Sequence, residues 1–179
     1  MARYVALLGS INVGGHRVTM DRLRTECEAF GLRNVSTFIA SGNVIFDASA
    51  RPATVERDLA AMLGDRLGFP VAVFVRTAAA VVAAAAREPF GEIAEGDTHH
   101  VGFLRAAPPV AAVAATHALS NDQDTLAVVG TELHWRIRGG FASSSIKTAT
   151  LVKALGQAMT VRNATSVRKL AAILRDTTA

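Results

Sequence analysis

Two short segments of strand character lie only two residues apart in this sequence. VSTFIA (residues 35–40) and NVIFDA (residues 43–48) carry β-branched and aromatic side chains and are separated by Ser41 and Gly42. Two residues can join antiparallel strands in a hairpin, but they leave no room for the helix that links parallel strands. The sequence therefore excludes a doubly wound parallel sheet for this part of the chain.

The segments around this hairpin extend the pattern on both sides. RYVALLG (residues 3–9) predicts a strand, and the stripe Met20, Leu23, Cys27 and Phe30 predicts a helix that begins after Thr19 and ends near Gly31. A second helix begins at Pro52 and ends at Gly68, and VAVFVR (residues 71–76) predicts a further strand. Residues 1–76 thus follow the β-α-β-β-α-β order of a ferredoxin-like unit.

The same order of elements returns in the second half of the chain. The segments after residue 97 are HHVGFLR (strand), PPVAAVAATHAL (helix), TLAVVGTELHWRI (hairpin turning at Gly130-Thr131), SSSIKTATLVKALGQ (helix with a serine as N-cap), MTVR (strand) and a last helix over residues 165–175. The prediction is an α+β fold of two ferredoxin-like units with mainly antiparallel sheets and a C-terminal helix. The expected divisions are 1–76, a linking helix and loop over 77–97, and 98–179, and the units can also pack as one intertwined domain.

Composition limits the class of protein. Half of the residues are hydrophobic and 19% are charged, which favours a folded chain over a disordered one. No apolar run reaches the ~20 residues that a membrane span needs, and MARYVALLGS fits a first strand better than a signal peptide. The single cysteine, Cys27, excludes an internal disulfide and is expected to be a buried, inert thiol. We therefore expect a cytoplasmic protein with no membrane contact.

The charge is distributed unevenly along the chain. The net charge is +4, yet from Arg136 onward there are eight basic residues and one acidic residue, Asp176. The three lysines, Lys147, Lys153 and Lys169, all lie in this basic segment. Such an asymmetry is typical of an anionic partner, either nucleic acid or a phosphorylated metabolite, and equally of a solvated helical face.

Topology brings two polar loops to the same edge of the first sheet. In a β-α-β-β-α-β unit, the exit of the first strand and the turn between the second and third strands lie at the same edge. We expect these residues of the two loops to be neighbours there: Asn12, Gly14, Gly15, Ser41, Gly42 and Asn43. Glycine lets backbone N–H groups face an anion, and the helix that begins near Thr19 favours negative charge. Asparagine and glycine also serve tight turns, so turn chemistry alone remains the alternative.

Three stretches resemble a known bacterial family. They are YVALLGSINVGGHRVTMDRLR, FIASGNVIF and IKTATLVKALGQAMTVRNATSVRKLA, and they are similar to the domain of unknown function 1697, whose members carry RGINVGG, SGNV and RNW at these places. The resemblance implies an α+β fold with ferredoxin-like halves and no established activity. This chain departs from the pattern at Gly9-Ser10, where the family has Arg-Gly, and at Ala164, where the family has Trp.

Other chemical patterns in the sequence have structural explanations. His99 and His100 are adjacent on a strand and point to opposite faces, so they cannot hold one metal ion together, although His134 could join one of them. Ser144 and Lys147 have the spacing of serine–lysine acyl-transfer enzymes, but the accompanying motifs are absent. The carboxylates of Asp122 and Asp124 are expected in solvated turns. No catalytic motif is complete, and no metal or cofactor is implied.

The leading functional hypothesis is a non-catalytic module that binds a small anionic or phosphate-bearing ligand. The ligand would lie at the edge formed by the two polar loops, with Lys147, Arg162 and Asn163 as further contacts. The alternative is a small enzyme of unknown reaction that uses the same edge. The third hypothesis is weak nucleic-acid binding through the basic C-terminal segment, which lacks exposed aromatic residues for base stacking.

Overall fold

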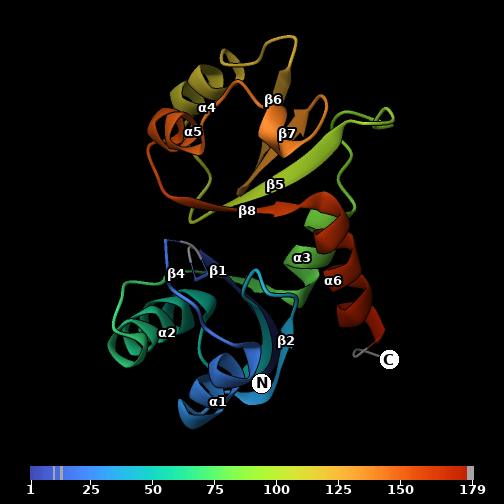
Figure 1. The fold of residues 1–179 in the computed structure, drawn as a ribbon. Helices are drawn as coiled ribbons and strands as arrows, with labels where there is room; N and C mark the ends of the chain where they lie inside the picture. The colour runs from blue at the N-terminus through green and yellow to red at the C-terminus, as the bar shows by residue number, and fades with distance from the viewer. Residues whose placement is uncertain (10, 13, 177–179) are drawn as a thin grey trace. The chain divides into compact units, whose positions relative to one another are not determined.

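The computed structural model describes residues 1–9, 11–12 and 14–176, and the chain forms two compact units. The first unit comprises Met1–Val82 and the end of the chain from Leu174, and the second comprises Ala83–Ile173. Each unit contains one four-stranded antiparallel sheet, and Figure 1 shows the helices beside each sheet. The mixed α/β class with two antiparallel sheets, which the sequence predicts, is confirmed.

The first unit has the predicted order of elements. They are β1 (Ala2–Gly9), α1 (Met20–Ala29), β2 (Arg33–Phe38), β3 (Asn43–Ala48), α2 (Pro52–Leu67), β4 (Ala72–Thr77) and α3 (Ala78–Ala85). The strands lie in the order β2-β3-β1-β4, with Tyr4 of β1 opposite Phe46 of β3 and Thr77 of β4. This order and the antiparallel pairing are those of a ferredoxin-like sheet.

Local signals explain where the helices of the first unit begin and end. The hydroxyl of Thr19 accepts a hydrogen bond from the Arg22 backbone N–H at 3.2 Å, so Thr19 is the N-cap of α1. Gly68 ends α2 in the left-handed conformation, with a φ of 79°. Leu23, Cys27, Leu59 and Leu63 pack from the two helices on the same face of the sheet. Cys27 is fully buried as expected, and burial raises the pKa of its thiol to about 12.

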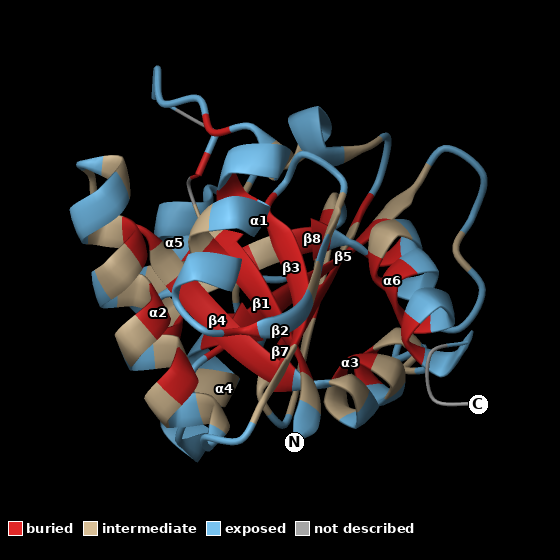
Figure 2. Cartoon of the chain, turned by 90° about the horizontal axis from the view of Figure 1, so that it is seen from below, coloured by how far each residue is buried: buried red, intermediate tan, exposed pale blue. Residues whose placement is uncertain are grey.

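The second unit repeats this architecture. Its elements are β5 (Thr98–Leu104), α4 (Val110–His117), β6 (Asp124–Val129), β7 (Glu132–Ile137), the 3-10 turn η1 (Phe141–Ser143), α5 (Thr148–Leu155), β8 (Met159–Asn163) and α6 (Ala164–Asp176). The strand order is β6-β7-β5-β8. Leu104, Leu133 and Trp135 pack against Leu151 and Leu155 of α5 on one face of the sheet, and the strands are largely buried (Figure 2).

One predicted helix start in the second unit is wrong. The helix expected to begin with a serine N-cap begins at Thr148, and its N-cap residue, Lys147, makes no side-chain capping bond. Ser144 and Ser145 instead donate hydrogen bonds to the carboxylate of Asp124. The serines are therefore held by a buried acceptor in β6, which local propensity does not reveal. None of the helices in the described part of the chain is long and apolar enough to cross a membrane.

Candidate functional site

The exit of β1 and the β2–β3 turn lie in contact, as the topology predicts. The backbone N–H of Leu8 donates a hydrogen bond to the carbonyl of Gly42 at 2.8 Å. Gly42 has a φ of 79°, and a Cβ atom added there would lie 2.7 Å from Cγ2 of Ile11. Glycine is needed at this position both for its backbone angle and for the close approach of the two loops.

Asn12 ties these two loops together through its side-chain amide. Its Oδ1 accepts a hydrogen bond from the Val18 backbone N–H at 2.8 Å, and its Nδ2 donates to the Ala40 carbonyl at 2.9 Å. Gly14 and Gly15 lie between these contacts with φ angles of 66° and 91° and have open space around them. The amide of Asn12 thus holds the ends of the loop, while the two glycines remain accessible.

Asn43 and Ser41 serve the turn itself. Asn43 is buried, and its Nδ2 donates to the Phe38 carbonyl at 2.9 Å and to Oγ of Ser41 at 3.1 Å. Six residues are expected to line the edge of the sheet. Two of them, Gly42 and Asn43, are buried and stabilise the turn. The structure brings all six to one edge of the first unit, and ligand contact by any of them remains a prediction.

A groove of about 370 Å³ lies beside the two loops, and we call it the first-unit groove. It is lined by Asn12, Arg17, Val18, Thr19 and Ala40. The side chain of Arg17 is exposed, and no described residue forms an ion pair with it. The neighbouring residue His16 stacks on Phe69, with 3.9 Å between ring centroids and 15° between ring planes. This stacking fixes the segment that carries Arg17.

The turn next to this groove contains a strained residue. Ile39 has a φ of 52° and is 43% exposed. A β-branched residue in this conformation is a genuine outlier, because its branched side chain crowds the backbone there. Strained backbone positions are over-represented at binding sites, where the surrounding structure maintains them. Neither the burial of Asn43 nor the strain at Ile39 could be inferred from residue types alone.

The three further contacts expected from the sequence lie in the second unit and serve different roles. Arg162 is buried in β8, where its Nη1 donates to Oγ1 of Thr160 at 2.9 Å, and burial lowers the pKa of its guanidinium to about 10. Lys147 is exposed and precedes α5, which packs on the opposite face of the sheet. Asn163 caps α6 by accepting a hydrogen bond from the Thr165 backbone N–H at 2.8 Å. Arg162 and Lys147 thus lie on opposite sides of the second sheet and do not form one cluster.

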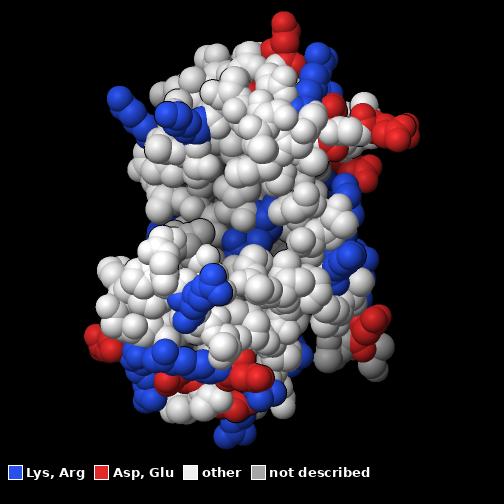
Figure 3. Space-filling view, viewed as in Figure 1, with Lys and Arg blue, Asp and Glu red and all other residues white. Residues whose placement is uncertain are grey.

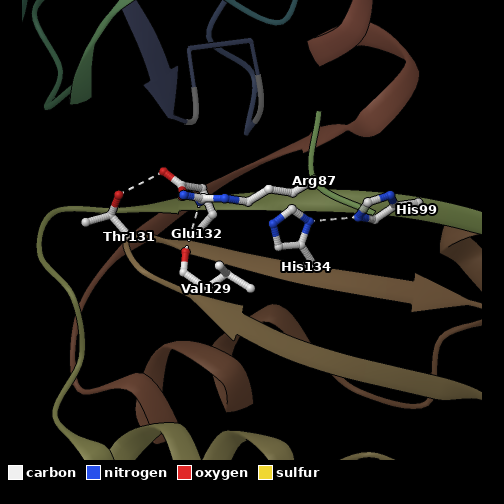
Figure 4. Close-up of polar contacts among 6 residues, drawn as sticks. All are labelled: Arg87, His99, Val129, Thr131, Glu132 and His134. Atoms are coloured by element: carbon white, nitrogen blue, oxygen red, sulfur yellow. Dashed lines mark hydrogen bonds and ion pairs between the residues drawn. The ribbon is translucent and has the colours of Figure 1, made fainter. Parts of the chain in front are cut away.

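Polar side chains are buried on the face of the second sheet opposite α4 and α5. His99 of β5 and His134 of β7 are joined by a hydrogen bond of 3.0 Å between His99 Nε2 and His134 Nδ1 (Figure 4). Arg87 forms an ion pair with Glu132 and donates to the Val129 carbonyl at 3.2 Å. Side chains alternate between the two faces of a strand, which correctly predicts that His99 and His100 point to opposite faces of the sheet. The contact between His99 and His134 depends in addition on the pairing of β5 with β7.

The two histidines are held in their neutral form. Burial lowers the pKa of His99 to about 4, and the nearby positive charges of His134, Arg168 and His100, when protonated, add to this effect. Burial also lowers the pKa of His134. Among the residues that the structure describes, no three His, Cys, Asp or Glu side chains are grouped so that they could hold a metal ion.

The expectation that Asp124 lies in a solvated turn is wrong. Its side chain is fully buried and accepts hydrogen bonds from Trp135 Nε1 at 2.8 Å, Ser144 Oγ at 2.6 Å and the Ser145 backbone N–H at 2.8 Å. Burial by itself raises the pKa of Asp124, but these hydrogen bonds outweigh it and hold the pKa below its ordinary value. Ser144 therefore bonds to a carboxylate and not to Lys147, which removes the serine–lysine pair as a catalytic candidate.

Comparison with known proteins places this architecture in a family. The model of the family described as "Protein of unknown function (DUF1697)" matches residues 1–134, which include the polar loops of the first unit. The chain belongs to this family. Among solved structures, this chain is similar to the conserved bacterial protein SP0830 from Streptococcus pneumoniae, with a TM-score of 0.72 and 23% sequence identity. That match covers 98% of this chain and 99% of the other chain and shows the shared fold. No curated protein matches this DUF1697 member.

Two of the positions where this DUF1697 member departs from the resemblance are described by the structure. Gly9 ends β1 opposite Ala72, and a Cβ atom added there would lie 3.2 Å from Cβ of Ala72. Ala164 begins α6 and is 5% exposed. Ser10 lies outside the described residues. The positions at which the family carries Arg and Trp are thus occupied here by two small residues in close-packed surroundings.

Proposed function

We propose that this DUF1697 member binds a small anionic ligand in the first-unit groove without chemical conversion of it. The observation that carries the proposal is the placement of Arg17 at the start of α1, beside two exposed glycines and a turn that is tied to the loop by Asn12. A cation and the first backbone N–H groups of a helix together form a favourable environment for a negative charge.

The preformed shape of the groove supports the same proposal. Asn12 uses both ends of its amide to hold the groove, and His16 stacks on Phe69 beside Arg17. A site whose walls are already ordered loses less conformational freedom on binding than a flexible loop. The strained conformation of Ile39 shows that the surrounding structure maintains an unfavourable backbone next to this groove.

Charge on the remaining surface does not favour an extended anionic polymer. Figure 3 shows the Lys and Arg side chains of one face in several separate places and no continuous stripe. Arg162, which the sequence assigns to the basic segment, is buried. A small ligand that needs one cation and a few N–H donors therefore fits this member better than a nucleic acid, which needs several contacts to phosphates.

Thermal denaturation in the presence of candidate ligands tests the proposal. Nucleotides, phosphorylated sugars, acyl-CoA and short RNA are added in turn, since a ligand of the folded state raises the unfolding temperature. We expect a small phosphorylated compound to raise it, and Arg17→Gln to weaken that compound by about tenfold, as expected for a lost charge-assisted hydrogen bond. Arg51→Gln is the matched control, because Arg51 is exposed at the start of α2, at the opposite edge of the same sheet.

Two outcomes would overturn the proposal. One is that no compound in the screen raises the unfolding temperature of the wild-type protein. The other is that Arg17→Gln and Arg51→Gln weaken binding equally, which would show a nonspecific effect of net charge. Conversion of the added compound during incubation, detected by mass spectrometry, would replace the proposal with the enzymatic alternative.

A further inference from the structure

A second groove lies in the first unit, where α3 begins. It has a volume of about 580 Å³ and is lined by Arg3, Thr77, Leu174, Arg175 and three residues of α3. We call it the α3 groove. None of its residues lines the first-unit groove. Its volume lies within the range of about 300–1,000 Å³ that is typical of small-molecule sites.

The wall that α3 contributes to this groove is apolar. The helix consists of alanine and valine alone, AAAVVAAA, although Ala79 is exposed and Ala78 and Val82 are only half-buried. A helix at a protein surface ordinarily carries polar residues on the side that faces water. Ala78, Ala79 and Val82 are the three α3 residues that line the groove, and Leu174 extends the apolar wall. Part of the apolar surface that α3 leaves uncovered therefore lies in the groove.

The charged side chains at this apolar wall are both positive. Among the described residues, the charged ones that line the groove are Arg3 and Arg175. The charge of Arg3 is offset by Asp47, to whose carboxylate oxygens Arg3 Nη1 donates at 3.2 and 3.3 Å. Arg175 is exposed and forms no ion pair with any residue that the structure describes. The charge of Arg175 is therefore available to an anionic ligand.

Thr77 adds a neutral hydrogen-bond donor to the groove. Its Oγ1 accepts a hydrogen bond from the Ala80 backbone N–H at 3.1 Å, which makes Thr77 the N-cap of α3. Within the described part of the chain, no residue accepts a hydrogen bond from the Thr77 hydroxyl group. The dipole of α3 also favours a negative charge at this end of the helix. The polar side chains that line the groove thus offer donors to a ligand.

An apolar wall combined with such donors matches a ligand that has an aliphatic tail and a carboxylate. The tail gains free energy by leaving water, roughly in proportion to the apolar area that it buries. The carboxylate can accept two parallel hydrogen bonds from one guanidinium group. A small hydrophilic anion would leave the apolar wall in water, and a neutral hydrocarbon would supply no acceptor to Arg175.

We propose that the α3 groove binds an aliphatic monocarboxylate, with the tail on α3 and Leu174 and the carboxylate on Arg175. Ala78 and Val82 are four residues apart and lie on one face of α3, so they form a continuous strip for the tail. The residues and the ligand class differ from those of the first-unit groove. The proposal therefore does not depend on the function proposed above.

Titration calorimetry of the full chain with octanoate, butanoate and octylammonium tests the proposal at neutral pH. Octanoate and butanoate share a head group and differ in tail length, and each buried methylene group strengthens binding by up to about fourfold. We therefore expect octanoate to bind at least about tenfold more tightly than butanoate. Octylammonium has the same tail length with a positive head group and should bind at least about tenfold more weakly than octanoate, because Arg175 repels it.

Arg175→Gln tests the contact with the carboxylate. This variant should weaken octanoate by about tenfold, as for the loss of one charge-assisted hydrogen bond. Lys169→Gln should leave the affinity within about twofold. Lys169 is the matched control because it lies on the same helix, is also exposed and does not line the groove, while its replacement removes the same charge.

Ala79→Gln tests the contact with the tail. The longer polar side chain occupies part of the apolar wall and should weaken octanoate by about tenfold, with a smaller effect on butanoate. Ala53→Gln is the matched control and should leave the affinity within about twofold. Ala53 is the exposed second residue of α2, as Ala79 is of α3, and it does not line the groove.

Four outcomes would overturn the proposal. Octanoate could show no binding, or octylammonium could bind as tightly as octanoate. Arg175→Gln and Lys169→Gln could weaken octanoate equally, which would show a nonspecific effect of net charge. Arg17→Gln could weaken octanoate as much as Arg175→Gln does, which would place the ligand in the first-unit groove. Self-association that Ala79→Gln abolishes, in a protein that does not bind octanoate, would assign the groove to a second copy of the chain.

Discussion

His99 Nε2 lies 3.0 Å from His134 Nδ1, and both rings are buried on one face of the second sheet. The pair joins β5 to β7, whose residues His99 and Arg136 are directly opposite each other. A neutral pair needs one proton between the two nitrogens, and a second proton would place a buried positive charge there. Burial therefore favours the uncharged form of the pair.

Protonation of His99 should destabilise the fold as the pH falls. In the unfolded chain the pKa of His99 is 6.5, and in the folded chain it is about 4, so the unfolded state binds the proton first. Stability is fully present above pH 6.5 and is lost between pH 6.5 and 4, by about 3 kcal/mol for this group. Urea denaturation at several pH values measures the loss directly.

A variant that cannot take up the proton supplies the comparison. His99→Gln should be less stable than the wild type at pH 7 because it alters the contact with His134, and its stability should change less between pH 6.5 and 4. His117→Gln is the control, since His117 is exposed and accepts a hydrogen bond from the Val128 backbone N–H. Parallel pH profiles for wild type and His99→Gln would contradict the prediction.

Asp124 should be among the most sensitive polar positions of the second unit. Asp124→Asn keeps the size of the side chain but places an NH₂ group among donors from Trp135, Ser144 and Ser145. We expect a loss of about 3 kcal/mol in the free energy of unfolding at pH 7, because buried donors then lack an acceptor. Asp122→Asn, on an exposed neighbour, should change stability by less than about 0.5 kcal/mol.

The pH dependence of this variant has a defined sign. The pKa of Asp124 is below its ordinary value of about 4 in the folded protein, so its contribution is present above pH 4 and is lost as the pH falls through the folded pKa. The difference between wild type and Asp124→Asn should therefore narrow in acid. A difference that stays constant down to the onset of acid unfolding would mean that the carboxylate charge does not matter.

Much of the fold follows from local signals, whereas the polar interior does not. The two residues between β2 and β3 decide the antiparallel hairpin, and topology then places the Asn12 loop beside the Gly42 turn. Asp124 precedes a strand in a polar stretch, and residue type alone suggests a solvated turn. Its burial depends on donors 11 to 21 residues away that meet only after the sheet and the η1 turn have formed.

In the candidate sites, too, the sequence predicts some features, whereas others depend on tertiary contacts. Sequence reasoning correctly brings six loop residues to one edge, but it does not show that Asn43 turns inward to Phe38 while Arg17 faces the groove. In the second unit, His99 and Arg168 line one small cavity although they are far apart in the sequence, and their proximity depends on the pairing of β5 with β8. A strand register of this kind is a tertiary property and has no local signature.

Gly42 and Gly14 should respond differently to the same substitution. Gly42→Ala places a Cβ 2.7 Å from Cγ2 of Ile11 and 3.1 Å from Cβ of Leu8, in addition to the cost of a φ of 79°. We expect a loss of about 3 kcal/mol, since overpacking costs about 1–3 kcal/mol and left-handed strain about 1–2 kcal/mol. Gly14→Ala carries only the strain of a φ of 66° and should cost about 1 kcal/mol.

Denaturant unfolding of both alanine variants measures this difference. Ile11→Ala removes the Cγ2 atom that the new methyl group of Gly42→Ala meets. The double variant should therefore lose less free energy of unfolding than the sum of the losses of the two single variants. Similar costs for Gly42→Ala and Gly14→Ala would show that the two loops do not pack as closely as the contact between Gly42 and Ile11 requires.

Ile39 is a position where a polar substitution should stabilise the protein. Its φ of 52° is unfavourable for a β-branched residue, and 43% of its side chain is exposed, so little apolar burial is lost on replacement. Asparagine adopts the left-handed conformation more readily than other non-glycine residues, and Ile39→Asn should raise the free energy of unfolding by about 1 kcal/mol. Thr37→Asn is the matched control, because Thr37 pairs with Val44 inside the sheet, where asparagine is unfavourable. The same new residue should therefore stabilise at position 39 and destabilise at position 37, and a loss of stability at both would show that Ile39 contributes more through packing than it costs in backbone strain.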